Sequence, residues 1–263
     1  MTRGSTAVPG AAVRATFRAD LFSGKRALVV GGSSGIGAAI ARAFADCGAQ
    51  VTVTGATSEE VASFRDADAD AIDDAVVLDV RETPAIAALI DRLPRLDFLV
   101  ACAGIIRRGD EHRLDVFEDV LSVNLTGTMR CATLGRPKLT AAVPAGGGAI
   151  VNMASVLSYQ GGALVPAYSA SKGGVAQLTK SLALAYAVDG IRVNAIAPGW
   201  VRTPLTKALQ QDPARSDAIL SRTPLRRWAD PEDVAGAALF LCSPAARFMT
   251  GTVVPVDGGY LVA

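Results

Sequence analysis

Continuous apolar runs alternate with longer amphipathic stretches along the chain, beginning near Lys25. Such runs are typical of strands buried on both faces of a parallel sheet, and the amphipathic stretches are typical of helices packed against it. The expected strands are Ala27–Val30, Val51–Thr54, Ala75–Val80, Phe98–Ala101, Ala149–Met153, Arg192–Ala197 and Val253–Val256. The expected helices are Ala38–Cys47, a short one opening at 57–60, Pro84–Arg92, Val116–Arg130, Ala167–Val188 and Pro231–Leu241. The alternation predicts an α/β fold, a single doubly wound Rossmann-type domain with a parallel seven-stranded sheet and helices on both faces.

Neither a linker nor an internal repeat interrupts this alternation, so residues 21–263 are expected to form one domain. Residues 1–20 are rich in small residues and lack the continuous apolar core of a signal peptide. They are predicted to be a flexible N-terminal extension, with a transit peptide or a subunit-contact arm as alternatives. The polar stretch 204–228 contains prolines and charges and is predicted to be a substrate lid, with a plain surface excursion as the alternative.

Composition excludes some classes of function. Lysine and arginine number 26 against 25 aspartate and glutamate, so no global field indicates a nucleic acid or an anionic membrane as partner. No apolar run is long enough for a membrane span. The four cysteines are scattered without metal or redox spacing, which favours a reducing cytoplasm. His112 is the single histidine, so a histidine-based triad or metal site has little support, and no metal is predicted.

A glycine-rich segment, VGGSSGIG, lies between the first expected strand and the first expected helix. Glycine allows a tight turn and a close approach of backbone to a pyrophosphate, and the following helix N-terminus offers amide donors. The candidate contacts are Gly31, Ser33, Ser34, Gly35, Ile36 and Gly37. Because a plain strand–helix turn can also use glycines, the placement after an apolar strand is what favours a dinucleotide site.

The end of the second strand bears on the choice between NAD and NADP. A carboxylate there would bind the ribose diol and repel a 2′-phosphate, but residues 54–57 contain none. Glu59 and Glu60 come slightly later and are more simply acids of the first helical turn. Thr57 and Ser58, with the serines of the glycine segment, offer hydroxyls for a phosphate. The pattern favours NADP(H), with NAD(H) as the alternative.

Two further strand ends are candidate contacts for the adenosine half. Asp79 and Val80 close the third expected strand, and Asp79 is either an adenine contact or a helix cap. Ala103 and Gly104 follow the fourth strand, where small side chains would let the adenosine lie flat.

Tyr168 and Lys172 stand four residues apart in YSASK, so a helix would place them on one face. A tyrosine hydroxyl can donate a proton to a carbonyl oxygen, but its pKa near ~10 makes the reverse step slow at neutral pH. A nearby ammonium stabilises the tyrosinate and lowers that pKa. Taken alone, the pair is equally compatible with an ordinary surface contact.

Several segments in the same order resemble the short-chain dehydrogenase/reductase family, from about Leu21 to the C-terminus. They are VGGSSGIG (Val30–Gly37), CAG (Cys102–Gly104), SVNLTG (Ser122–Gly127), NMAS (Asn152–Ser155), YSASK (Tyr168–Lys172) and APGWVRT (Ala197–Thr203). Ser155 also stands thirteen residues before Tyr168, as in the family. The combination is far more specific than any one segment, and it implies a nicotinamide-dependent oxidoreductase.

The resemblance implies a role for each matching residue. Tyr168 would be the general acid/base, and Lys172 would lower its pKa and bind the nicotinamide ribose. Ser155 would hydrogen-bond the substrate oxygen, and Asn124 would help to hold a water that links Lys172 to solvent, a role compatible with a helix kink. Pro198, Gly199, Val201 and Thr203 would line the nicotinamide. The family also implies a homotetramer.

Two positions depart from the family pattern. Val30 stands where a threonine is usual, which removes a hydroxyl that braces the glycine turn. Ala101 and Cys102 replace the usual pair of asparagines, which removes side-chain hydrogen bonds between neighbouring strands. Both departures affect local stability and cofactor affinity rather than proton transfer.

Within the family, the chain is similar to sugar-acid dehydrogenases of the gluconate 5-dehydrogenase and 2-dehydro-3-deoxygluconate 5-dehydrogenase kind. The similar segments are GIIRR (Gly104–Arg108), SVLSYQGG (Ser155–Gly162) with Val165–Pro166, and RTPLRRW (Arg222–Trp228). Arg107, Arg108 and Arg202 are candidate guanidinium partners for a substrate carboxylate, and Gln160 is a candidate for a hydroxyl. Each arginine is more simply interpreted as solvated or held in a structural ion pair.

Two other functions stay open. The first is a 3-oxoacyl-thioester (acyl-carrier-protein) reductase, which shares the whole catalytic set and a segment like ATSEE (Ala56–Glu60). The second is a nicotinamide-binding regulatory protein without catalysis, which would tolerate loss of the Ser/Tyr/Lys set that is present here. Turnover of substrates from each class separates the three hypotheses.

Overall fold

The computed structural model describes residues 15–68 and 72–263. Its strands are β1 (Arg26–Val30), β2 (Gln50–Gly55), β3 (Asp74–Val77), β4 (Phe98–Ala101), β5 (Ala149–Met153), β6 (Arg192–Pro198) and β7 (Val253–Val256). Its helices are α2 (Gly35–Asp46), α3 (Ser58–Asp68), α4 (Thr83–Arg92), α5 (Leu114–Leu121), α6 (Gly127–Ala142), α7 (Pro166–Tyr186), α8 (Lys207–Gln210), α9 (Pro213–Ser221) and α10 (Pro231–Cys242). All strand pairs are parallel, in the order β3-β2-β1-β4-β5-β6-β7. The predicted doubly wound, seven-stranded fold is confirmed.

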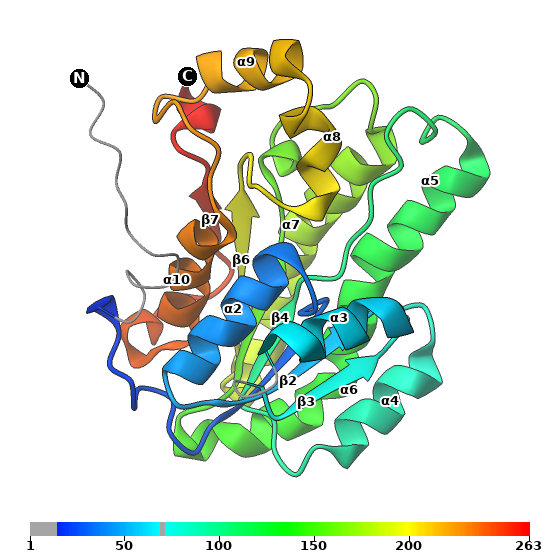
Figure 1. Cartoon of the computed structure of the whole chain (residues 1–263). Coiled ribbons are helices and arrows are strands. Elements are labelled where there is room, and N and C mark those ends of the chain that lie inside the picture. Colours follow the sequence, from blue (N-terminus) through cyan, green and yellow to red (C-terminus); the bar gives the residue numbers. More distant parts are fainter. Residues whose placement is uncertain (1–14, 69–71) are drawn as a thin grey trace.

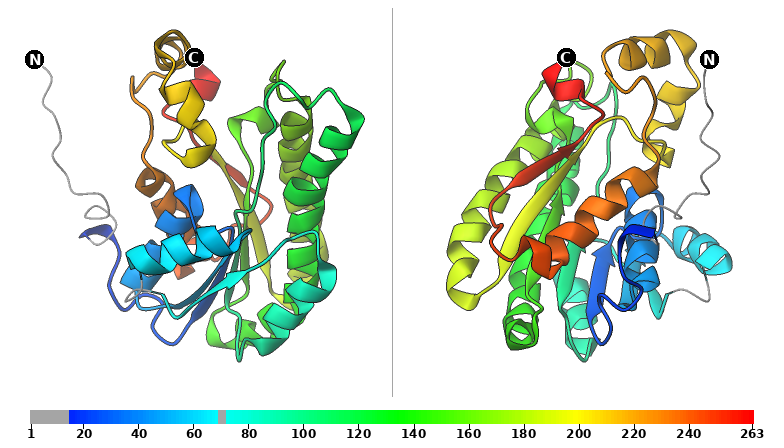
Figure 2. Two further views of the ribbon diagram at one scale, coloured as in Figure 1. Left: turned by 45° about the vertical axis from the view of Figure 1, so that its right-hand side comes forward. Right: turned by 90° about the vertical axis from the view of Figure 1, so that its left-hand side faces the viewer.

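Helices cover both faces of this sheet (Figure 1). Helices α2, α3 and α10 lie on one face, and α4, α5, α6 and α7 lie on the other, as the left view of Figure 2 shows. The central strands β4 and β5 are buried along their whole length. Strands covered on both faces read as continuous apolar runs, which is why the sequence pattern located them well.

Alternate residues of β1 serve two separate cores. Ala27 and Val29 point into the cluster under α2 and α10, where the rings of Phe22, Phe44 and Phe98 pack together. Leu28 and Val30 belong to the cluster on the opposite face. Successive side chains of a strand point to opposite faces, so one short run stabilises both helical layers.

The order in which strands are added to the sheet reverses at β1, whose neighbours are β2 on one side and β4 on the other. In open parallel sheets such a switch point leaves a crevice at the carboxyl ends of the strands, because the flanking connections run to opposite faces. This edge of the sheet is therefore where a ligand site is expected.

The helix expected at Val116–Arg130 differs from the observed one. Helix α5 ends at Leu121, a π-helical turn occupies Ser122–Thr126, and α6 then continues to Ala142 through Pro137. Burial of Cys131, Ala132, Gly135, Leu139 and Ala142 along one face of α6 outweighs the weak helix propensity of glycine and proline. The third strand is also shorter than expected and ends at Val77.

Two segments outside the sheet bear on the predicted domain boundaries. Phe17 packs against the core and contacts Gly236 on α10, so the folded part begins before residue 21. Residues 1–14 of the predicted extension lie outside the described residues.

The segment 204–228 contains α8 and α9, which lie above the carboxyl ends of the strands (Figure 1). Leu209, Ile219 and Trp228 form a small core of their own there.

Candidate active site

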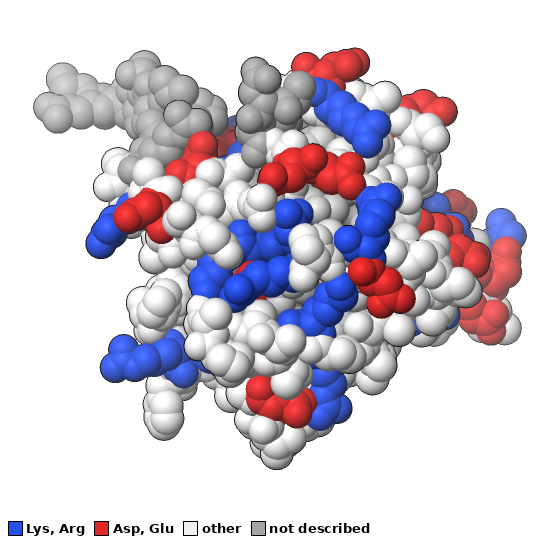
Figure 3. Space-filling view, turned by 90° about the horizontal axis from the view of Figure 1, so that it is seen from below, with Lys and Arg blue, Asp and Glu red and all other residues white. Residues whose placement is uncertain are grey.

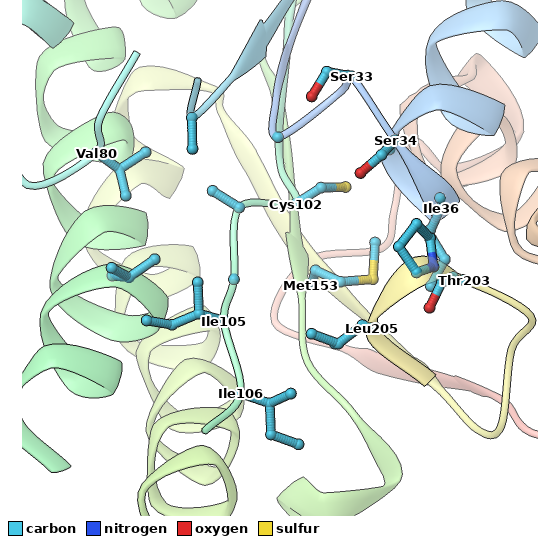
Figure 4. Close-up of a pocket in the computed structure, with 18 of the residues that line it drawn as sticks. Ser33, Ser34, Ile36, Val80, Cys102, Ile105, Ile106, Met153, Thr203 and Leu205 are labelled. Atoms are coloured by element: carbon cyan, nitrogen blue, oxygen red, sulfur yellow. The ribbon is translucent and has the colours of Figure 1, made fainter. Parts of the chain in front are cut away.

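A cavity of about 530 Å³ opens at the carboxyl edge of the sheet (Figure 4). Ligand pockets of cofactor size fall in this range of volumes and at this position in doubly wound folds. The predicted cofactor contacts that line it are Gly31, Ser33, Ser34, Gly35, Ile36, Gly37, Thr57, Asp79, Val80, Ala103, Gly104, Tyr168, Lys172, Pro198, Gly199, Val201 and Thr203. Ser155 and Arg107 also line it, whereas Asn124, Gln160 and Arg202 do not. The structure thus brings together residues from the ends of strands β1 to β6 and from α7.

The glycine segment forms a tight turn that side chains could not occupy. Gly31 has φ +76°, and a Cβ there would lie 2.6 Å from the Ala103 backbone nitrogen. A Cβ at Gly37 would collide with the Gly31 carbonyl oxygen. The turn is also braced from β2, because the Gly31 N–H donates to Thr54 Oγ1 at 3.1 Å. This bond supplies a brace from β2 in a chain that has Val30 where the family has threonine.

The N-terminus of α2 faces the cavity without a side-chain cap. Ser34 is the N-cap, its side chain makes no capping hydrogen bond, and the first turn contains no acidic residue. Figure 4 shows the Ser33 and Ser34 side chains at the rim next to this turn. The first amides of a helix and the positive end of its dipole suit a phosphate group. The residues present therefore fit the pyrophosphate of a nicotinamide dinucleotide.

Glu60 lines the cavity, a position that its place in the sequence did not indicate. Its amide donates to Thr57 Oγ1 at 3.2 Å, and its carboxylate accepts the Ala56 N–H at 2.9 Å, so both bonds brace the first turn of α3. The interpretation as a first-turn helix acid is therefore correct. The same fold-back, however, places Glu60 in the cavity wall beside the end of β2.

Asp79 lies two residues beyond the end of β3 rather than on the strand. Arg81 holds its carboxylate through Nε at 3.0 Å and Nη2 at 2.7 Å, and this hydrogen bonding lowers the pKa of Asp79. Asp79 also accepts the Arg81 backbone N–H at 2.9 Å, so it stabilises a turn and does not cap α4, whose N-cap is Glu82.

The residues predicted to transfer the proton converge at the inner end of the cavity. Ser155 follows β5, while Tyr168 and Lys172 lie on the first two turns of α7. The Lys172 Nζ lies 5.5 Å from the centroid of the Tyr168 ring and donates to the Met153 carbonyl oxygen at 2.6 Å. Burial lowers the pKa of Lys172 to about 8, with 3% of the residue exposed.

The pKa of Tyr168 is raised, whereas the sequence analysis expected Lys172 to lower it. Burial of the hydroxyl is the largest cause, and the carboxylate of Glu111 adds to it. The Ser155 hydroxyl and the Arg108 guanidinium act in the opposite direction but do not offset burial. Desolvation of the phenolate therefore outweighs the effect of its favourable neighbours.

Asn124 lies in the π-helical turn and is fully buried. Its Oδ1 accepts the Ile105 N–H at 2.8 Å, and its Nδ2 donates to the Ile105 carbonyl and the Ser171 hydroxyl, both at 3.0 Å. The side chain thus ties the loop after β4 to α7. Asn124 Oδ1 and Lys172 Nζ both approach Gly104, which has no side chain to separate them. The predicted water relay at Asn124 stays a prediction.

The candidate substrate residues are spread over different environments. Arg107 is exposed and lines the cavity. Arg202 lies outside the cavity wall and donates to Asp230 at 3.3 Å, an ion pair that matches the structural interpretation. Gln160 is half-buried and lies outside the wall.

Some wall residues were not anticipated from the sequence. Ile105, Ile106, Met153 and Leu205 give the substrate end an apolar lining (Figure 4). The position of Ile105 and Ile106 directly after the fourth strand was the one sequence feature that could have placed them in the wall. Glu111 is fully buried below the Arg107 loop, and nothing in the charged segment GDEHR indicated its burial.

The opposite edge of the sheet has a different character. The amino ends of the strands carry Lys25, Arg26 and Arg192, and Figure 3 shows basic side chains gathered on this face. Lys25 and Arg95 pair with the buried carboxylate of Asp97, so part of this charge is compensated. In residues 15–68 and 72–263 no cluster of three His, Cys, Asp or Glu side chains has a metal-binding arrangement, and no helix is long and apolar enough to cross a membrane.

Comparison with known proteins identifies relatives along almost the whole chain. Residues 30–261 match the family described as Enoyl-(Acyl carrier protein) reductase. The chain is 43% identical to cis-4-hydroxycyclohexanecarboxylate dehydrogenase of Sinomonas cyclohexanicum, over 92% of this chain and 98% of that protein. It is 42% identical to 2-dehydro-3-deoxy-D-gluconate 5-dehydrogenase of Bacillus subtilis (strain 168), over 92% and 97% of the two chains.

A solved structure agrees with these sequence relatives. The gluconate 5-dehydrogenase of Burkholderia cenocepacia J2315, in complex with NADP and tartrate, is 36% identical, with a TM-score of 0.83 over 93% of this chain and 98% of that chain. The sheet order, the glycine turn and the Ser155–Tyr168–Lys172 cluster are what the sequence resemblance implied. The chain therefore belongs to the short-chain dehydrogenase/reductase family of NAD(P)-dependent oxidoreductases.

Proposed function

We propose that this protein interconverts a secondary alcohol and the corresponding ketone in a hydroxy acid of the sugar-acid type, with NADP(H) as the preferred cofactor. The observation that carries the proposal is one continuous cavity. Its outer part is the glycine turn at the N-terminus of α2, and its inner end holds Ser155, Tyr168 and Lys172. A dinucleotide bound along it would bring its nicotinamide to the proton-transfer residues.

Each residue of the cluster has a distinct task in this reaction. Pro198, Gly199, Val201 and Thr203 would hold the nicotinamide, which would supply the hydride for reduction of the carbonyl carbon or take it up in oxidation of the alcohol. Tyr168 donates the proton to the substrate oxygen in reduction and removes it in oxidation. Ser155 hydrogen-bonds the same oxygen, and the Lys172 ammonium favours the tyrosinate left after donation. The side chain of Asn124, in the π-helical turn, holds α7 against the loop after β4. The water that Asn124 is predicted to hold would return protons from solvent.

The names of the relatives support a substrate that carries a carboxylate. Cis-4-hydroxycyclohexanecarboxylate, 2-dehydro-3-deoxy-D-gluconate and gluconate each combine a carboxylate with hydroxyl groups. In this chain, the exposed guanidinium of Arg107 on the cavity wall is the group placed to bind such a carboxylate. Ile105, Ile106 and Leu205 would cover the carbon skeleton.

The second candidate is a 3-oxoacyl-thioester reductase, which the acyl-carrier-protein wording of the matched family keeps in view. A substrate panel with NAD and NADP distinguishes the two. We expect turnover of hexonates, keto-deoxy acids or hydroxycycloalkane carboxylates and none of acetoacetyl thioesters. Turnover of the thioesters alone would establish the second candidate, and cofactor binding without turnover across the panel would favour a non-catalytic protein.

The cofactor preference rests on the hydroxyls of Ser33, Ser34 and Thr57 near the end of β2, together with the NADP held by the Burkholderia enzyme. Glu60 opposes it, because its carboxylate stands in the same wall. We infer that NADP binds despite Glu60, whose charge is partly compensated by the Ala56 N–H. Titration of the protein with each cofactor gives the ratio of the two dissociation constants.

Assembly, lid and compartment complete the proposal. Met129 on α6, Leu184 on α7 and Val188 in the turn just after α7 are exposed apolar side chains, which supports subunit contacts in a homotetramer. The segment 204–228 would act as a lid, since Pro204, Leu205 and Thr206 line the cavity. All four cysteines are free, which supports a reducing cytoplasm. Light scattering of the purified protein tests the tetramer.

A further inference from the structure

Two loops meet beside the proton-transfer cluster and are joined by backbone contacts. The loop after β4 contributes the Gly109 N–H, which donates to the Leu164 carbonyl oxygen at 2.9 Å. His112 Nε2 lies 2.9 Å from the Ala163 carbonyl oxygen and donates to it. Both acceptors belong to the segment just before α7. The single histidine of the chain is thus part of a connection between the two loops.

Glu111 is the buried member of this connection. None of its surface is exposed, and a carboxylate is expensive to bury unless its oxygens are hydrogen-bonded. Oε1 accepts the Arg107 N–H at 2.8 Å, and Oε2 accepts the Tyr168 N–H at 2.8 Å. One side chain therefore links the cavity-lining Arg107 to the catalytic tyrosine.

The Tyr168 amide needs such a partner. It is the third residue of α7, and the first amides of a helix have no acceptor within the helix. Val165, the N-cap of α7, provides no side-chain hydrogen bond. Glu111 supplies from another element the acceptor that a capping residue normally gives, and its negative charge suits the positive end of the helix dipole.

We propose that Glu111 is a positioning residue, whose two hydrogen bonds fix the Tyr168 hydroxyl and the Arg107 loop relative to each other so that proton transfer and substrate docking share one geometry. The role of the site itself rests on the proposed function. The role of Glu111 rests on its hydrogen bonds to the Arg107 and Tyr168 amides, which do not depend on the identity of the substrate.

Charged groups from three elements surround Tyr168 or its neighbours. Glu111 and Arg108 come from the loop after β4, and Lys172 comes from α7, while Arg215 on α9 faces Arg108. Burial is the main cause of the raised pKa of Tyr168, and the charge of Glu111 raises it further. Removal of that charge should therefore move the titration of Tyr168 to lower pH.

The main test is Glu111→Gln, which keeps the size of the side chain, removes the charge and leaves only one acceptor atom. The matched control is Glu118→Gln, an exposed position on the neighbouring helix α5. We expect kcat to fall on the order of ten- to a hundred-fold, as small misplacements of a catalytic group do, with the dissociation constant for NADP unchanged. The pH midpoint of the oxidation rate should move downward. Equal kcat and equal midpoints in both variants would overturn the proposal.

Glu111→Asp separates charge from geometry and serves if the glutamine variant does not fold. The shorter side chain keeps the charge but reaches only one of the two amides. We expect a midpoint like that of the unmodified protein with kcat between those of the unmodified protein and Glu111→Gln. A variant with unchanged kcat and KM would contradict the positioning role.

A measurement without substrate separates this proposal from the proposed function. Ultraviolet titration of tyrosine, taken as the difference between each protein and its Tyr168→Phe version, follows the Tyr168 hydroxyl directly. A lower midpoint in Glu111→Gln supports the proposal even if no substrate of the panel is turned over. An unchanged midpoint counts against it even if the panel identifies the substrate.

Discussion

The inner end of the cavity and its outer rim are built in opposite ways. At the inner end, Ser155 and Lys172 are buried and fixed by backbone hydrogen bonds, and Tyr168 is anchored through Glu111. At the rim, Arg107 is exposed, and Arg202 makes its ion pair with Asp230 outside the cavity wall. Buried groups have one allowed geometry because each needs a partner, whereas exposed groups exchange partners with water at little cost. Reaction chemistry is thus fixed by the core of the fold, and substrate choice is left to its surface.

The largest expected effect is at the inner end. Tyr168→Phe removes the hydroxyl that we propose donates and accepts the proton, and it leaves the ring in place. We expect kcat to fall by about a thousand-fold or more, within the range of general acid–base contributions, with cofactor affinity retained. Tyr159→Phe is the matched control, because Tyr159 is exposed and lies outside the cavity wall. Near-normal turnover by Tyr168→Phe would refute the assigned mechanism.

The second prediction concerns how far the buried ammonium of Lys172 lowers the free energy of unfolding. The folded protein binds the Lys172 proton more weakly than the unfolded chain does, because burial lowers the pKa to about 8. Folding is therefore penalised at pH below about 8, and the penalty disappears as pH rises toward the ordinary lysine pKa. Lys172→Met should raise the free energy of unfolding at neutral pH by about 2 kcal/mol while abolishing turnover. One pKa unit corresponds to about 1.4 kcal/mol, and loss of the bond to Met153 removes part of the gain.

Denaturant unfolding at several pH values measures this effect, with Lys180→Met as the control on the exposed face of the same helix. The difference between Lys172→Met and the unmodified protein should shrink as pH rises above about 8. A difference independent of pH would mean that the ammonium is not the destabilising group.

The same contrast explains what the sequence could predict. The strands Phe98–Ala101 and Ala149–Met153 were predicted to the residue, because burial along the whole strand leaves a nearly continuous apolar run. The candidate proton-transfer residues could be proposed because a helix spacing, a strand end and a glycine turn each restrict the residue types allowed. By contrast, the extent of α6 and the burial of Glu111 depend on partners distant in the chain, which local patterns do not encode. The raised pKa of Tyr168 was missed for the same reason.

At the rim, the third prediction is that Arg107→Ala raises KM about ten-fold for a substrate with a carboxylate. An exposed charge-assisted hydrogen bond contributes on the order of 1 to 2 kcal/mol, and its loss should not affect kcat, because Arg107 does not touch the reacting atoms. An uncharged polyol turned over by the same enzyme is the internal control. Equal increases in KM for both substrates would place the carboxylate elsewhere.

A smaller effect is expected where the cofactor meets the rim. Glu60→Gln removes a carboxylate from the wall beside β2 and should tighten NADP relative to NAD by about five-fold, since an exposed like-charge pair near contact costs roughly 1 kcal/mol. Glu59→Gln removes the same charge one residue away, outside the cavity wall, and is the matched control. Cofactor titration of the three proteins measures the ratio. If both variants change the ratio of the two dissociation constants equally, the effect comes from the net charge of the protein and not from the position of Glu60 in the wall.

The smallest effect should come from Arg202→Ala. Both partners of the pair with Asp230 are about half exposed, with side-chain exposures of 49% and 54%, and such pairs contribute roughly 0 to 1 kcal/mol. We therefore expect KM for the acidic substrate to change by less than about two-fold, and the free energy of unfolding by less than about 1 kcal/mol. Steady-state kinetics beside Arg107→Ala provides the comparison. If KM rises as much as in Arg107→Ala, Arg202 exchanges Asp230 for the substrate when the segment 204–228 closes, and the rim then changes its ion pairs during binding while the inner end keeps its own.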